Sequence, residues 1–221
     1  MRKVLITGGS RGIGYAIAKK FSANGYDVVA PTRAELDLTD GASIHQFIRV
    51  HQDIFFDVII NNAGCNDVNL IGQIQDEELE RMMNINLIAP IKLLRGFVGK
   101  MKENHYGRIV NIGSIWGVVS KGGRTVYSAT KHAIHGVTGT LSVELASDNI
   151  LVNTVCPGFT LTEMTHKNNT LDEILAISKD IPVGRMAEPE EIAEVVFFLG
   201  HETNTYLTGQ KIVVDGGFTI K

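Results

Sequence analysis

Residues 3–14 of the chain read Lys-Val-Leu-Ile-Thr-Gly-Gly-Ser-Arg-Gly-Ile-Gly, an apolar run followed at once by a glycine-rich turn. The run predicts a buried strand, and the residues from Ile13 onward predict a helix. Between a strand and a helix, backbone N–H groups and the helix dipole can meet a pyrophosphate. The stretch therefore predicts a phosphate-binding loop that contains Gly8, Ser10, Arg11, Gly12, Ile13 and Gly14.

The spacing of this loop leaves two alternatives open. It is G-x-x-x-G-x-G, which differs from the G-x-G-x-x-G of many dinucleotide sites, and a plain tight turn would also need glycines. Gly8-x-Ser10-x-Gly12 also fits the nucleophile turn of α/β-hydrolases. A hydrolase needs an upstream loop to complete its oxyanion hole, and only seven residues precede Gly8, which disfavours that alternative.

Length and composition predict one globular domain over residues 1–221. The chain has 44% hydrophobic and 20% charged residues, which is typical of a soluble protein rather than a disordered or membrane-spanning one. Lys and Arg number 21 against 24 Asp and Glu, so there is no basic surplus for a phosphate backbone. We expect no nucleic-acid partner.

The cysteines and histidines indicate a cytoplasmic protein without a metal. Cys65 and Cys156 are too few for a disulfide framework and lack the spacing of a zinc site. His132 and His135 have helical spacing, but no third ligand is evident. The apolar run at 4–6 is cut by glycines, so it has no signal-peptide core, and no stretch is long enough to span a membrane. We expect no membrane partner.

Short Val- and Ile-rich runs alternate with helical patterns along the chain, which predicts a Rossmann-type, doubly wound α/β fold with a parallel sheet. The predicted strands are Lys3 to Thr7, Asp27 to Pro31, Asp57 to Asn61, Arg108 to Gly113, Leu151 to Cys156 and Lys211 to Val214. The predicted helices are Ile13 to Asn24, Ser43 to Gln52, Glu77 to Glu103, Tyr127 to Ser147 and Pro189 to Leu199.

The interval after the second predicted strand is unusually short. Only a few residues separate Thr32-Arg33 from the turn at Asp37 to Asp40, whereas a parallel crossover needs a dozen or more. We expect the helix between the second and third strands to be missing or much shortened. Residues 35–38 then run as irregular chain at the sheet edge, or form a residual strand; the first alternative is favoured.

Tyr127 and Lys131 lie four residues apart at the start of a predicted helix, and so on one helical face. A cation beside a phenol lowers its pKa toward the range of a general acid or base. Ser114 ends one predicted strand, and Asn61-Asn62-Ala63-Gly64 ends the strand before it. Ligands bind at these carboxyl ends of a parallel sheet.

Together these motifs resemble the short-chain dehydrogenase/reductase family. T-G-x-x-x-G-x-G, N-N-A-G, the Asn of Asn84-Ile85-Asn86-Leu87, Ser114, Y-x-x-x-K and Pro157-Gly158 occur in the family's order over nearly the whole chain. Within the family, His105 to Ser114, Pro157-Gly158-Phe159 and Leu207 to Gln210 are most similar to the 3-oxoacyl-[acyl-carrier-protein] reductases.

The resemblance implies a catalytic set of Asn86, Ser114, Tyr127 and Lys131. Tyr127 is then the proton donor or acceptor, and Ser114 holds the same substrate oxygen. Lys131 binds the nicotinamide ribose and lowers the pKa of Tyr127, while Asn86 fixes a helix irregularity and a proton-relaying water. Trp116 and Arg124 fall in the segment that faces substrate, although Trp116 is equally well explained as core.

The resemblance also implies further cofactor contacts. They are Asp37 and Leu38 at the adenine, Asn62, Ala63 and Gly64 at the adenosine ribose, and Pro157, Gly158, Thr160 and Thr162 at the nicotinamide. Residues 163–185 resemble the family's substrate lid, for which an ordinary surface loop and helix is the alternative.

The end of the second strand favours NADP(H) over NAD(H). An acidic residue there suits a ribose 2′-hydroxyl, whereas a basic one suits a 2′-phosphate. Arg33 stands there, and Arg11 offers a second guanidinium. Glu35 and Asp37 keep NAD(H) as the alternative, because either could turn toward the ribose.

We expect an NADPH-dependent reductase of a 3-oxoacyl thioester or a similar ketone. The alternatives are a sugar-linked or small-metabolite ketone or alcohol, and a nicotinamide-binding module without chemistry. An intact Ser114, Tyr127 and Lys131 set favours an enzyme over that module. An apolar stripe of Leu87, Ile91, Leu94 and Phe97, with the family resemblance, predicts a homodimer or homotetramer.

Overall fold

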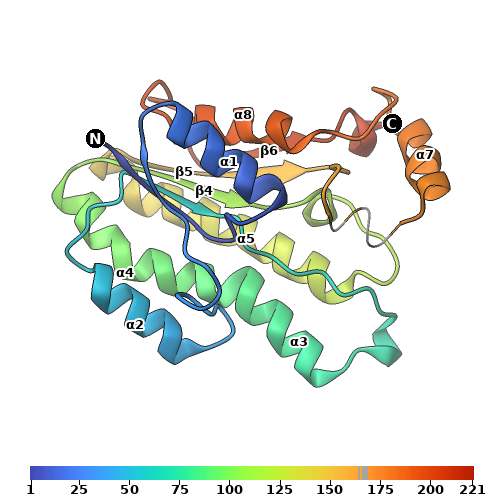
Figure 1. The fold of residues 1–221 in the computed structure, drawn as a ribbon, viewed down its shortest axis with the longest axis horizontal. Coiled ribbons are helices and arrows are strands. Elements are labelled where there is room, and N and C mark those ends of the chain that lie inside the picture. The colour runs from blue at the N-terminus through green and yellow to red at the C-terminus, as the bar shows by residue number, and fades with distance from the viewer. Residues whose placement is uncertain (164, 166–168) are drawn as a thin grey trace.

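The computed structural model describes residues 1–163, 165 and 169–221 of the chain. Within them, one parallel sheet has six strands in the order β2-β1-β3-β4-β5-β6 (Figure 1). The strands are β1 (Lys3–Ile6), β2 (Asp27–Val29), β3 (Val58–Asn61), β4 (Gly107–Ile112), β5 (Ile150–Pro157) and β6 (Lys211–Val214). The predicted doubly wound α/β fold is confirmed.

Helices cover both faces of this sheet (Figure 1). On one face of the sheet lie α1 (Gly12–Ala23), which packs Ile17 and Phe21 into the core, and α8 (Pro189–Gly200), which packs Val196 there. The other face packs Phe47 of α2 (Gly41–His51) and Phe97 of α4 (Ala89–Glu103), together with Leu145 of α5 (Thr125–Leu145). Every residue of β3, β4 and β5 is consequently buried, including polar residues such as Arg108, Asn111 and Asn153.

The long helix predicted over 77–103 is divided in the structure. It consists of α3 (Asp76–Met83), a π-helical turn at Asn84–Ile88, and α4. A π-turn inserts an extra residue into the helical hydrogen-bond pattern, and periodicity alone does not reveal it. The helix α7 (Leu171–Asp180) lies within the predicted lid segment, beyond the end to which the strands of the sheet point (Figure 1). Of that segment, Met164 and His166 to Asn168 lie outside the described residues.

One expectation about the sheet edge needs correction. Residues 35–38 do run as irregular chain, as favoured. However, the helix between the second and third strands is neither missing nor shortened, because α2 spans eleven residues there. The side chain of Asp40 caps its first turn by accepting from the N–H of Ala42 at 2.8 Å, and Ile44 and Phe47 bury its apolar face. The crossover is therefore complete once α2 is counted, and it leads directly from β2 to β3.

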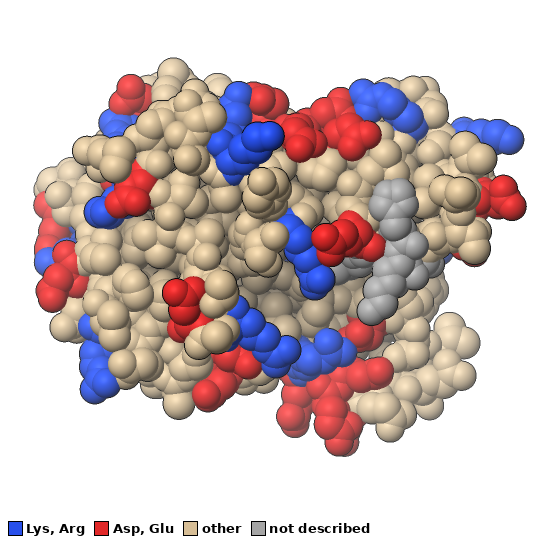
Figure 2. All heavy atoms as spheres, in the orientation of Figure 1, with Lys and Arg blue, Asp and Glu red and all other residues tan. Residues whose placement is uncertain are grey.

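The surface carries charges of both signs. On the face in Figure 2, basic and acidic side chains are interspersed, and the net charge of the chain is −3. Among the described residues, no helix is both long and apolar enough to cross a membrane.

The strand order fixes where a ligand can bind. β1 pairs with β2 on one side and β3 on the other, so the chain changes direction across the sheet between β1 and β3. In open parallel sheets the crevice at the carboxyl ends of such a pair is the ligand site. The glycine loop after β1 and the Asn62-Ala63-Gly64 segment after β3 both leave the sheet there.

Candidate active site

The glycine loop is packed too closely for side chains. Gly8 and Gly12 have φ values of +68° and +53°, in the left-handed region that favours glycine. A Cβ on Gly14 would lie 2.2 Å from the carbonyl oxygen of Gly8 and 2.4 Å from Nδ2 of Asn62. The first turn of α1 therefore contacts the loop backbone directly, as the spacing predicts.

The segment after β3 holds this loop in place. Asn62 donates from Nδ2 to the carbonyl oxygens of Thr7 and Gly8, at 3.0 and 3.1 Å. The buried Thr7 hydroxyl accepts from the backbone N–H groups of Asn62 and Ala63, both at 3.1 Å. Asn62 and Ala63 thus brace the loop. Sequence reasoning did not single out Thr7, although it is the first residue of the glycine motif.

The start of α1 suits an anion. No side chain caps the helix at Arg11, and its first turn has no acidic residue. The N–H groups and the positive end of the helix dipole are then available to a phosphate. With a loop that no Cβ can fill, these residues fit the pyrophosphate of a dinucleotide.

The segment after β5 reaches across to the glycine loop. A Cβ on Gly12 would lie 3.4 Å from Cγ2 of Thr162, and Arg11 Nη1 lies 3.7 Å from a carboxylate oxygen of Glu163. Gly158 can have no Cβ either, since it would lie 2.7 Å from Cα of Asp215. The structure therefore brings Thr162 beside the loop, where the resemblance places a cofactor contact.

At the end of β2 the charged groups pair with each other. Arg33 donates from Nε to Asp37 at 3.1 Å, and 81% of its side chain is exposed. Hydrogen bonds from Thr39 lower the pKa of Asp37, and hydrogen bonds from Thr32 lower that of Glu35. Both carboxylates therefore already accept hydrogen bonds from neighbouring residues. Leu38, half-buried, lies beside them.

Ser114 and Tyr127 form the chemical centre. Ser114 follows β4 and accepts from the N–H of Trp116 at 3.2 Å through its hydroxyl oxygen. Burial raises the pKa of Tyr127, and the hydroxyl of Ser114 and the charge of Arg124 lower it only in part. Lys131 is expected to lower this pKa, but in this structure the rise caused by burial is the larger effect, and the ammonium group of Lys131 donates to the carbonyl oxygen of Ile112.

Lys131 is a buried cation held by the sheet. Its Nζ donates to the carbonyl oxygen of Ile112 at 2.6 Å and lies 5.6 Å from the centre of the Tyr127 ring. Burial lowers the pKa of Lys131 to about 8. A Cβ on Gly64 would lie 3.7 Å from this Nζ, so the ammonium group faces the segment after β3.

Asn86 lies in the π-turn, so the helix irregularity expected there is present. Its Oδ1 accepts from the N–H of Cys65, and its Nδ2 donates to the carbonyl oxygen of Cys65, both at 2.9 Å. Nδ2 also donates to Thr130 at 3.2 Å. Asn86 thereby ties the segment after β3 to the turn of α5 that carries Lys131.

An aromatic cluster forms one wall beside Ser114. Trp116 packs edge-on against Phe159 and Phe218, with ring centres 6.0 and 6.3 Å apart, and it is 8% exposed. The two phenylalanines come from the segment after β5 and from the carboxyl-terminal turn, so only the fold shows that they meet Trp116. Core packing accounts for Trp116 at least in part.

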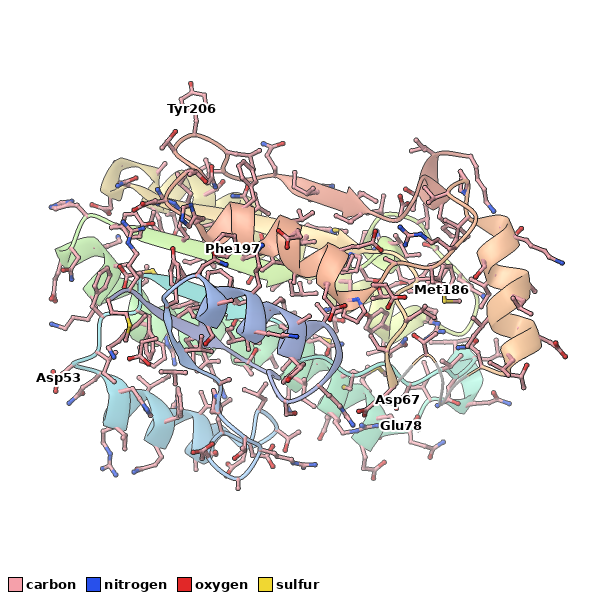
Figure 3. All side chains as sticks on the ribbon, turned by 45° about the horizontal axis from the view of Figure 1, so that its top comes forward. Asp53, Asp67, Glu78, Met186, Phe197 and Tyr206 are labelled. Carbon is pink, nitrogen blue, oxygen red and sulfur yellow. The ribbon has the colours of Figure 1, made fainter. Side chains whose placement is uncertain are left out.

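Residues 65–69, which follow the Asn62-Ala63-Gly64 segment, are tied to α3. Arg81 of α3 forms an ion pair with Asp67, and Asn69 donates to Glu78 at 2.8 Å. Figure 3 labels Asp67 of this segment and Glu78 of α3. The described residues contain no group of His, Cys, Asp and Glu that could hold a metal.

Comparison with known proteins identifies relatives along the whole chain. A family model described as short chain dehydrogenase matches residues 2–43, and one described as Enoyl-(Acyl carrier protein) reductase matches residues 30–219. The 3-oxoacyl-[acyl-carrier-protein] reductases FabG of Vibrio harveyi and Escherichia coli are each 34% identical, over 96% of this chain and 95% of theirs.

Solved structures agree with these relatives. A 4-hydroxyisoleucine dehydrogenase complexed with NADH superposes with a TM-score of 0.93 and 26% identity, covering 100% of both chains. ElxO with NADP bound superposes with a TM-score of 0.91 and 29% identity, covering 100% of this chain and 99% of its own.

The buried ammonium group predicts a pH-dependent stability difference for Lys131→Met. In the unfolded chain the lysine titrates near its usual 10.5, and in the folded chain near 8. Between these values the unfolded chain binds more protons, so Lys131 makes the free energy of unfolding rise with pH, and its full penalty applies below about pH 8. The variant's stability relative to the natural chain should therefore be highest at and below pH 7 and fall by about 3 kcal/mol by pH 10.5.

Urea unfolding at several pH values measures this difference. Lys19→Met, which removes an exposed lysine on α1, is the control and should give a difference that hardly changes with pH. If the difference in the free energy of unfolding between Lys131→Met and the natural chain did not change with pH, the lowered pKa of Lys131 would be contradicted.

Proposed function

The chain belongs to the short-chain dehydrogenase/reductase family, and we propose that it is an NADPH-dependent carbonyl reductase that converts a ketone to an alcohol. One observation carries the proposal. The hydroxyls of Ser114 and Tyr127 come together beside Lys131, at the carboxyl ends of the strands, where the glycine loop also lies. Two hydroxyls can hold and protonate one oxygen, which suits a carbonyl better than the carbon–carbon double bond of an enoyl group.

Tyr127 and Ser114 act on the substrate oxygen. The nicotinamide, when bound, supplies the hydride for the carbonyl carbon. Because burial keeps the pKa of Tyr127 above its usual value, the phenol is protonated at neutral pH and can donate its proton to the oxygen. The oxygen of Ser114 already accepts from Trp116, which leaves its own hydrogen free to donate to the same substrate oxygen. In the oxidative direction Tyr127 takes the proton back.

Lys131 and Asn86 support this chemistry. One hydrogen of the Lys131 ammonium group is used by Ile112, so two remain for the ribose hydroxyls of a bound nucleotide. Asn86 is a positioning residue, because it touches Cys65 and Thr130 rather than the reacting atoms. A water beside Asn86 would relay protons toward Lys131.

The glycine loop and the segments facing it would hold the nucleotide. The phosphates would lie on the start of α1, at Gly8, Ser10, Arg11, Gly12, Ile13 and Gly14. Asp37, Leu38 and the Asn62-Ala63-Gly64 segment would line the adenosine side, and Pro157, Gly158, Thr160 and Thr162 the nicotinamide side. Arg33, exposed at the end of β2, and Arg11 favour the 2′-phosphate of NADPH.

The proposed substrate class rests on the relatives. The 34% identity to 3-oxoacyl-[acyl-carrier-protein] reductases supports a 3-oxoacyl thioester or a similar ketone. The likeness to a 4-hydroxyisoleucine dehydrogenase supports a small-metabolite ketone or alcohol as the alternative. Trp116 and Arg124 would contact the substrate on either proposal.

A cytoplasmic location fits the two free cysteines.

A homodimer is proposed through α4 and α5, with a homotetramer as the larger assembly. A hollow of about 540 Å³ lies between these helices, lined by Ile91, Leu94, Val98, Val137 and Leu141 among others. Ile91 is 42% exposed, and Val143 on α5 is 83% exposed. Apolar side chains exposed along two adjacent helices are typical of a helix-pair interface.

Tyr127→Phe tests the chemistry. It removes the proton donor and keeps the ring, so kcat should fall by about 10²- to 10⁴-fold while the Kd of NADPH changes little. The assay follows NADPH absorbance with a 3-oxoacyl thioester, simple ketones and a sugar-nucleotide ketone. Tyr206→Phe, at a side chain 94% exposed, is the control. Full activity of Tyr127→Phe would show the mechanism to be wrong, and NADPH binding without turnover of any ketone by the natural chain would favour the binding module.

Arg33→Ala tests the choice of cofactor. Loss of a charge-assisted contact should raise the Kd of NADPH by about tenfold and leave the Kd of NADH nearly unchanged. The preference for NADPH over NADH, measured as the ratio of the two Kd values, should therefore become smaller. Fluorescence titration of both nucleotides measures it, with Arg49→Ala on the exposed side of α2 as the control. A natural chain that binds NADH more tightly than NADPH would contradict the preference.

Ile91→Glu tests the assembly. In an isolated chain the new carboxylate would lie in water, but in a dimer it would be buried without a partner, and that burial is strongly unfavourable. Light scattering after gel filtration should show the mass falling toward the 24.1 kDa of one chain. Val50→Glu, 62% exposed on α2, should leave the mass of the assembly unchanged. An unchanged mass for Ile91→Glu would place the interface elsewhere.

A further inference from the structure

Arg124 has a half-buried side chain, and two of its guanidinium nitrogens are shielded from solvent. Its Nε and Nη1 atoms are shielded from solvent and have no hydrogen-bond partner among the described residues. Burial lowers the pKa of Arg124, and the charge of the Tyr127 phenol raises it in part. Buried charged donors are normally satisfied, so an unsatisfied one indicates a missing partner.

The chain itself offers no carboxylate for this role. No Asp or Glu occurs between Glu103 and Glu144, a stretch that includes Ser114, Tyr127 and Lys131. In the described part of the chain, Arg124 belongs to none of the ion pairs. The four residues outside that part are Met164, His166, Lys167 and Asn168, none of which has a carboxylate.

Arg124 is held close to Tyr127 by its place in the chain. It immediately precedes α5, three residues before Tyr127. The carbonyl oxygen of its neighbour Gly123 accepts from the N–H of Asn69 at 3.1 Å, and Gly123 has a φ of +77°. This hydrogen bond connects the loop before α5 to residues 65–69. Arg124 lies one turn of chain from Tyr127 and has two nitrogens shielded from solvent, and its charge lowers the pKa of that phenol in part.

We propose that Arg124 binds a carboxylate of the substrate, so that the preferred ketone is a small oxo acid rather than a neutral ester or thioester. The inference rests on the proposed carbonyl reductase, and among its substrates it favours the small-metabolite ketone over the 3-oxoacyl thioester. A guanidinium presents planar N–H donors that match a carboxylate, and a bound water could satisfy the hydrogen bonds but not the charge. The closeness of Arg124 to Tyr127 favours a carboxylate over a bulkier phosphate, since a carboxylate can lie one or two carbons from a ketone.

The experiment compares acetoacetate with its neutral ethyl ester and with the acetoacetyl thioester of N-acetylcysteamine. For each, kcat/KM is measured with saturating NADPH in the natural chain and in Arg124→Gln. The acid-to-ester ratio of kcat/KM should fall by about 10- to 100-fold in Arg124→Gln, mainly through KM, because a charge-assisted contact is lost. Arg124→Lys keeps the charge without the planar fork and should recover part of the ratio.

Lys121→Gln is the matched control. It removes the same charge from the same loop, but Lys121 is exposed and lies 5.8 Å over the Trp116 ring. The ratio should stay within about threefold of the natural chain, since an exposed charge is screened. A thermal melt of each variant confirms that it is folded. Because Arg124 has no partner to lose, Arg124→Gln should melt no lower than the natural chain.

The outcomes separate this inference from the proposed function. An acid-to-ester ratio that is the same in Arg124→Gln and the natural chain overturns the carboxylate site, while turnover of the ester keeps the reductase. If acetoacetate is not reduced, malonate and succinate are tested as competitive inhibitors against any ketone that is. Inhibition that weakens in Arg124→Gln supports the site, and no inhibition overturns it. Turnover of no ketone at all contradicts the reductase, and calorimetric binding of malonate to the NADPH-loaded protein then decides the carboxylate site alone.

Discussion

The contact between Gly14 and the backbone of Gly8 is the constraint on which the rest of the site depends. There is no space for a single methyl group at Gly14, because the carbonyl of Gly8 and the amide of Asn62 fill it. This packing draws the first turn of α1 down onto the end of β1 and fixes both against the segment after β3. The donors at the start of α1 and the groups around Lys131 thereby face one crevice.

A second set of buried polar groups sets the distance between the sheet and α5. Asn61 of β3 donates to Asn111 of β4 at 2.8 Å, Asn111 donates to Thr138 of α5 at 2.9 Å, and Thr138 bonds to Thr154 of β5 at 2.7 Å. Buried hydrogen bonds fix position more strictly than apolar contacts do, because a small shift leaves an atom unpaired. This chain of bonds holds α5 in register, so Tyr127 near its start stays close to Ser114, which follows β4.

The sequence predicts the parts of the site that lie within one element and misses those that depend on neighbours. The glycine loop, the Tyr127 and Lys131 pair and the end of β4 follow from local pattern and spacing. The direction of the Tyr127 pKa does not, because burial is a property of the packed site. The pairing of Arg33 with Asp37 and the lack of a partner for Arg124 depend on side-chain geometry. The meeting of Trp116 with Phe218 joins segments about a hundred residues apart.

The direct passage from β2 through α2 to β3 leaves β2 as an edge of the sheet. An edge strand exposes unpaired N–H and C=O groups that could recruit a strand from another molecule. Here the edge is only three residues long, and Pro31 soon follows it and has no N–H to offer. Asp27 adds a charge, paired with Lys3 on the neighbouring strand. This edge of the sheet is thus protected against edge-to-edge aggregation by the same few residues that lead the chain toward the proposed adenosine side of the site.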